Sequence, residues 1–92
     1  MKIYTIWQEI NNNYDTYDSA IVYAENEEEA KRIHPNPYYK FDEEGDEYWT
    51  KNEGYKQVSN SWCALKDVKA KYLGENKDVK EKGLIIASFN AG

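Results

Sequence analysis

The stretch KIYTIWQEI, residues 2–10, is the strongest indication of the fold in this sequence. Its β-branched and aromatic side chains occupy successive positions, so both faces of a strand here would be apolar. Such a strand is covered on both sides or lies within an oligomer. A second apolar run, SAIVYA at residues 19–24, follows a loop rich in turn formers at residues 11–18. We therefore expect the two runs to pair antiparallel across that loop.

A short helix is expected directly after the second strand. Asn26 can cap its amino end, and Glu29 stands at the third helical position, where it can complete a capping box. The acidic side chains of the first turn also complement the positive end of the helix dipole. The helix should end near His34, because Pro35 disfavours helical geometry in the residue before it.

The second half of the chain is less regular. Residues 36–61 carry no sustained period and are interpreted as an excursion with one hairpin, residues 47–50 against 55–58. Regular structure returns at residues 62–73, and LIIASF at residues 84–89 has the composition of a buried strand.

The predicted order is therefore β-β-α-excursion-β-β. This order indicates one α+β domain over residues 1–92, with a small, mostly antiparallel sheet of about four to five strands and one short helix. In a chain this small, self-association often supplements the core, so a homo-oligomer is expected.

The charge balance restricts the class of ligand. There are 17 acidic and 12 basic residues, a formal net charge of −5. Proteins that bind duplex nucleic acid carry a surplus of Lys and Arg along one face, so this class is not expected. A small nucleotide needs only one or two cations and stays possible. The nine Tyr and three Trp favour recognition, because their rings combine a large apolar body with a polar tip.

The cellular location follows from cysteine use and hydropathy. Cys63 is the only cysteine, which excludes an internal disulfide and suits a reducing compartment. No stretch approaches the roughly 18 apolar residues of a membrane span, and the first residues lack the apolar region of a signal peptide. We expect a cytosolic protein that does not bind membranes.

Motifs for enzyme, cofactor and metal chemistry are missing from the sequence. It has no glycine-rich phosphate loop and no nucleophile elbow, so no catalytic residue and no cofactor is predicted. Cys63 and His34 could form a nucleophile and base, but Cys63 is better interpreted as a buried structural thiol. Carboxylates at positions 15, 18 and 42–47 lack the spacing of a helix-loop-helix calcium site, and a solvated loop is the better interpretation.

The segment RIHP, residues 32–35, places the only guanidinium and the only imidazole within one turn of each other at a helix end. Arg32 offers a bidentate fork suited to phosphate, and His34 can add a second donor. The alternative is that Arg32 caps the carboxyl end of the helix or pairs with a neighbouring Glu.

Three segments carry a resemblance to known proteins: YDTYDSAIV at residues 14–22, EEEAKRIHP at 27–35 and GLIIASFNAG at 83–92. Together they cover about a third of the chain. They resemble a family of small proteins encoded by tailed bacteriophages and prophages. The resemblance implies a phage protein that acts in the host cytoplasm. Small acidic phage proteins without enzyme motifs often counter host immunity.

This context gives a first hypothesis, a sponge that sequesters a small nucleotide immune signal. Tyr or Trp rings would stack on a base, Arg32 and His34 would contact phosphate, and Asn90 would read a base edge. The loop, the helix end and the chain end are typical places for such a site. The predicted ligand-binding residues are Tyr14, Asp15, Tyr17, Arg32, His34, Trp62, Phe89 and Asn90.

The alternative is an acidic protein inhibitor that occludes a host defence protein, of the anti-CRISPR or DNA-mimic type. The carboxylates of residues 25–29 and 42–47 would then face a basic groove on the partner. A third hypothesis is a phage assembly protein whose aromatic surface mediates morphogenesis.

Overall fold

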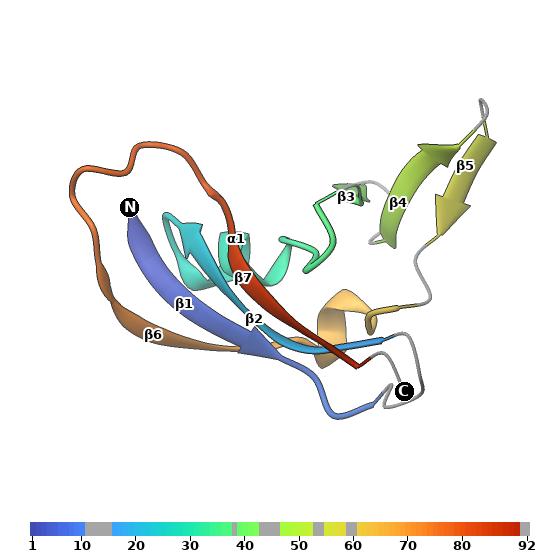
Figure 1. Ribbon diagram of the computed structural model, residues 1–92, viewed down its shortest axis with the longest axis horizontal. Helices are drawn as coiled ribbons and strands as arrows, with labels where there is room; N and C mark the ends of the chain where they lie inside the picture. Colours follow the sequence, from blue (N-terminus) through green and yellow to red (C-terminus); the bar gives the residue numbers. More distant parts are fainter. Residues whose placement is uncertain (11–15, 38, 43–46, 53–54, 59–60, 91–92) are drawn as a thin grey trace.

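The computed structural model describes residues 1–10, 16–37, 39–42, 47–52, 55–58 and 61–90. The described residues form seven strands, one α-helix and one 3-10 helix (Figure 1). None of the helices in these ranges has the length and apolar character needed to cross a membrane. In chain order the elements are β1 (Lys2–Trp7), β2 (Thr16–Ala24), α1 (Glu27–Lys31), β3 (Lys40–Asp42), β4 (Glu47–Asn52), β5 (Tyr55–Val58), η1 (Leu65–Asp67), β6 (Lys69–Glu75) and β7 (Gly83–Asn90).

Four strands form the main sheet, in the order β6-β1-β2-β7 with every neighbour antiparallel. The predicted pairing of the first two strands is confirmed, with Ile6 opposite Ala20. Strand β2 begins at Thr16, three residues before the predicted start. The earlier start has a physical reason: Gln8 N donates to Asp18 O (3.3 Å), so the ladder continues into the turn-forming segment.

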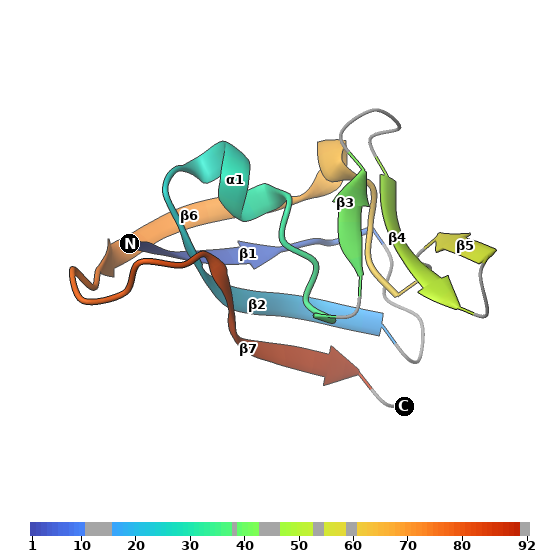
Figure 2. The same cartoon turned by 90° about the horizontal axis from the view of Figure 1, so that it is seen from above.

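The core lies on one face of the main sheet. Tyr4 and Ile6 of β1 alternate with half-buried neighbours, and Ala20 and Val22 do the same on β2. Helix α1 covers this face and contacts β1, β2 and β6 (Figures 1 and 2). Residues 61–68 add three buried side chains to the same cluster, those of Trp62, Cys63 and Val68. The predicted α+β fold with one short helix is confirmed.

Helix α1 begins as predicted and ends early. Asn26 Oδ1 accepts from Glu29 N (2.8 Å), which confirms the cap. Glu29 Oε1 accepts from Glu25 N (3.0 Å), one residue before the usual position of a capping box. The helix ends at Lys31 rather than near His34, because the N–H groups of Arg32 and Ile33 bond three residues back and tighten the last turn.

The excursion forms a second antiparallel sheet, in the order β3-β4-β5. The predicted hairpin is confirmed, since β4 pairs with β5 and Asn52 lies opposite Tyr55 at its end. Strand β3 was not predicted, because three residues are too few to show a period. In Figures 1 and 2 this hairpin extends away from the main sheet.

The prediction that the last strand is buried is wrong. Strand β7 lies at the edge of the main sheet and pairs with β2 alone among the described strands. Its Leu84 and Ala87 pack against the core, but Ile85, Ile86 and Phe89 are 42%, 61% and 48% exposed. A run of apolar residues therefore does not identify a central strand, because burial depends on which strands lie beside it.

Candidate binding groove

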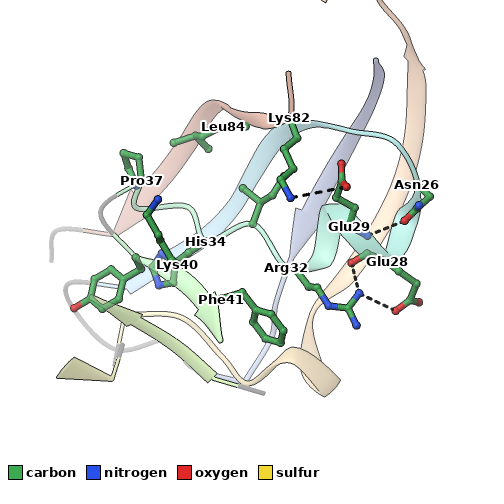
Figure 3. Close-up of a pocket in the computed structure, with 13 residues that line it drawn as sticks. Asn26, Glu28, Glu29, Arg32, His34, Pro37, Lys40, Phe41, Lys82 and Leu84 are labelled. Carbon is green, nitrogen blue, oxygen red and sulfur yellow. Dashed lines mark hydrogen bonds and ion pairs between the residues drawn. The ribbon is translucent and has the colours of Figure 1, made fainter. Parts of the chain in front are cut away.

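A groove of about 680 Å³ lies between α1, Pro37, residues 39–41 and the start of β7 (Figure 3). Sites for small molecules in proteins typically measure about 300–1,000 Å³. Three cationic side chains line this groove, together with two aromatic rings and several aliphatic groups. The cations are those of Arg32, Lys40 and Lys82, and the rings are those of Tyr39 and Phe41.

Arg32 follows α1 as its C-cap residue and lines the groove. Its Nη1 donates to Glu28 O (3.1 Å) and lies 3.7 Å from Glu28 Oε2. The guanidinium carbon is 5.5 Å from the centroid of the Phe41 ring, a cation–π distance. The alternative offered by the sequence, helix-end bonding and pairing with a Glu, is therefore what the structure shows. The side chain is 37% exposed, so its charge still faces solvent in the groove.

Lys82 and Lys40 were missed by the sequence interpretation. Lys82 precedes β7, and its Nζ lies 3.9 Å from Glu29 Oε2 across the groove, as Figure 3 shows. Lys40 begins β3 and is exposed. Both resemble ordinary solvated lysines in the sequence. Only the return of β7 to α1, and of β3 to the core, brings them to the groove that Arg32 lines.

His34 occupies a different environment, although it is only two residues from Arg32 and borders the same groove. It is 3% exposed, and its ring stacks on Tyr39 with centroids 4.6 Å apart and an interplanar angle of 24°. Its Nδ1 accepts from Asn36 N (2.8 Å). Desolvation by burial lowers the pKa of His34 to about 4. The imidazole is therefore neutral at pH 7 and brings no positive charge to the groove.

An aromatic cluster surrounds His34. The rings of Tyr17 and Trp62 lie 6.0 Å and 6.3 Å from the imidazole, and Phe89 lies 4.8 Å from Tyr17. Tyr17 N donates to Ser61 O (2.9 Å), which holds the chain beside Trp62 in place. Trp62 is 4% exposed, and its Nε1 is buried without a hydrogen-bond partner in the described part of the chain. Four predicted site residues thus meet here, with His34 and Trp62 buried, Tyr17 half-buried and Phe89 exposed.

The structure gives less information on the other three predicted site residues. Tyr14 and Asp15 lie outside the described residues. Asn90 ends β7, where its backbone pairs with Thr16 of β2.

The buried-thiol interpretation of Cys63 is confirmed. This side chain is 6% exposed, and burial raises its pKa to about 11, with the nearby Asp67 carboxylate adding to the effect. The thiol is therefore protonated at pH 7. Among the described residues, no three His, Cys, Asp or Glu side chains gather as metal ligands would.

The glutamates at the start of α1 form ion pairs with basic side chains of the same chain. Glu27 pairs with Lys31 (3.7 Å), Glu28 with Arg32 and Glu29 with Lys82. The second predicted acidic run, residues 42–47, lies mostly outside the described residues.

The groove therefore combines three cations and the two carboxylates of Glu28 and Glu29 with aromatic and aliphatic walls, in a chain whose net charge is −5. This combination can hold an anionic group at one side and a planar ring at the other. A comparison of the chain with protein-family models, curated proteins and solved structures finds no match.

Proposed function

We propose that this protein binds a small nucleotide in the groove beside α1, and that it acts as a phage-encoded sponge that sequesters a nucleotide immune signal of the host. One observation carries the binding proposal: Arg32, Lys40 and Lys82 come from three separate segments and line one groove in an acidic chain. The immune role comes from the sequence resemblance to phage proteins.

The cations are available to an anionic ligand. The Arg32–Glu28 and Lys82–Glu29 carboxylate distances are 3.7 Å and 3.9 Å, and in each pair one side chain is mostly exposed and the other partly so. Exposed ion pairs contribute only about 0–1 kcal/mol, so a phosphate can replace the carboxylate at little cost. Arg32 presents a planar fork that matches two phosphate oxygens, while a lysine acts as a point charge.

The rings and aliphatic side chains suit a base. Phe41 lies beneath the Arg32 guanidinium, so a base entering the groove meets both a π face and a cation. Tyr39 already stacks on His34 and thereby forms a rigid wall. Ile33 and Leu84 add apolar surface to the lining.

His34 has a supporting role in this proposal. Its neutral ring holds Tyr39 by stacking, and Asn36 N orients it through Nδ1. The predicted contact of His34 with phosphate stays a prediction.

The test is calorimetric binding of a panel of cyclic dinucleotides, cyclic trinucleotides and cyclic ADP-ribose isomers to the purified protein, its Arg32→Ala and Lys82→Ala variants, and a Lys71→Ala control. Removing a charged hydrogen-bond donor from a phosphate typically costs about 1.5–3 kcal/mol, so each groove variant should bind at least about tenfold more weakly. Lys71 is exposed on β6 and does not line the groove, so its variant should bind like the wild type.

Two results would overturn the proposal. One is the absence of binding across the whole panel, and the other is equal loss of affinity in the control and groove variants. Salt-sensitive binding to a basic host protein, with no nucleotide bound, would favour the inhibitor hypothesis instead.

A further inference from the structure

The two edges of the main sheet differ in chemistry. Strand β6 forms one edge and carries Lys69, Lys71 and Glu75, with a register shift opposite β1 near Leu73. Charged residues and bulges are the usual means by which proteins protect an edge strand from pairing with another chain. Strand β7 forms the other edge. Its pairing with β2 also has a register shift near Ile85, so the two edges differ in charge: the eight residues of β7, GLIIASFN, include no charged residue and no proline.

The β7 edge is also exposed and apolar. Ile85, Ile86 and Phe89 are 42%, 61% and 48% exposed. No described residue pairs with the side of β7 that faces away from β2. Figure 2 shows β7 along the border of the molecule, with no other labelled element beyond it. A long, uncharged, apolar edge strand is a template for pairing with another strand.

We propose that two copies of this chain associate by antiparallel pairing of their β7 strands, which joins two four-stranded main sheets into one continuous sheet. A two-fold axis near the middle of β7 satisfies this arrangement, because each copy then presents the same edge to the other. Full overlap of two eight-residue strands forms roughly eight backbone hydrogen bonds across the seam.

The charge distribution makes this edge the surface at which a second copy can dock. Each chain carries a net charge of −5, so two copies repel each other unless they meet at a surface without carboxylates. Residues 83–90 supply such a surface. The protected β6 edge then remains at both outer borders of the joined sheet, which stops further strand addition.

Pairing over the full strand also affects the surroundings of the groove. Gly83 and Leu84 line the groove at the start of β7, and antiparallel overlap sets this end of one strand beside the Phe89 end of the other. The two grooves of a dimer therefore lie at the two ends of the seam.

The experiment compares the mass of the wild type with those of Ile86→Lys and Leu73→Lys by sedimentation equilibrium over a range of protein concentrations. Ile86 lies near the middle of β7, so the substitution places two ammonium groups close to the two-fold axis. We expect the wild type to form a dimer of the 10.8 kDa chain, and Ile86→Lys to weaken self-association at least tenfold.

Leu73→Lys is the matched control, because Leu73 is 51% exposed on the edge strand β6. It should self-associate like the wild type. A monomeric wild type at every concentration would overturn the proposal, as would a dimer that tolerates Ile86→Lys. Circular dichroism of both variants should match the wild type, since both sites are exposed.

Amide hydrogen exchange separates strand pairing from packing of the sheet faces. With pairing, amides of β7 gain protection as the protein concentration rises, while amides of β6 do not. The alternative is a dimer in which the amides of β7 gain no protection with concentration and which Trp7→Lys, on the face of β1 opposite the core, dissociates. This result would show that the sheet faces pack together and would contradict the proposed pairing of β7 strands.

Discussion

Arg32 and His34 are two residues apart, yet they belong to two different regions of the molecule. The Arg32 side chain is 37% exposed and contributes a charge to the groove, while His34 is 3% exposed among aromatic rings and is uncharged at pH 7. The three-residue hydrogen bonds at the end of α1 separate them, because they turn the chain inward at Ile33. Both residues line the groove, but nearness in sequence did not give them the same charge or the same exposure.

The comparison teaches that the two regions respond to change in different ways. The interior region is held by close packing, where removing atoms leaves a cavity and charging a group requires desolvation. The groove is held by exposed ion pairs, which add little to stability. Changes in the interior should therefore alter folding, and changes in the groove should alter binding.

The largest effect is expected for Ile6→Ala in the interior. Ile6 is fully buried between the main sheet and its covering segments, so the substitution should lower the free energy of unfolding by about 4 kcal/mol. Ile10→Ala is the control, since Ile10 is 68% exposed, and it should change stability by less than about 0.5 kcal/mol. Urea denaturation measures both. Equal losses for the two variants would contradict the assigned core.

A somewhat smaller effect is expected on acidification. The unfolded chain binds a proton at His34 with a pKa near 6.5, whereas the folded protein resists protonation until about pH 4. Between these values the unfolded state holds more protons, so stability falls as the pH is lowered through this window, by roughly 3 kcal/mol in total.

His34 is the only histidine, so the difference between the wild type and His34→Gln isolates this contribution from that of the carboxylates. Denaturation of both proteins at several pH values from 4 to 7 gives the two slopes. Parallel curves would show that His34 titrates normally and that the interior position is wrong.

The smallest effect is expected in the groove. Lys82→Ala should change the free energy of unfolding by less than about 0.5 kcal/mol, because its pair with Glu29 is 3.9 Å long and the lysine is 64% exposed. The same variant should bind nucleotide more weakly, as proposed above. A large loss of stability would indicate that Lys82 stabilises the fold. It would contradict the expectation that changes in the groove affect binding and not folding.

Features with a local cause could be predicted from the sequence. The cap by Asn26 needs only an N–H three residues ahead, and the pairing of β1 with β2 needs only two apolar runs across a turn. The hairpin of β4 and β5 was found for the same reason.

Features that depend on strand order could not be predicted. Whether Ile86 is buried depends on the strand beside β7, and no local pattern reveals it. Likewise, Lys40 and Lys82 join the groove only because distant segments meet beside α1. Arg32 was found from its rarity as a residue type, whereas the lysines gave no such signal. The burial of the His34 imidazole among aromatic rings could not be predicted from the sequence either.

The central position of β1 has a consequence for how the molecule folds. One neighbour, β2, follows β1 after eight residues. The other, β6, begins only at Lys69, so its pairing with β1 requires a much longer stretch of chain to close. Closing loops of that length slows folding, and sheets built on distant pairings commonly fold in milliseconds to seconds. We expect the hairpin of β1 and β2 to exist early as an open template, with α1 and β6 closing over it in the slow step.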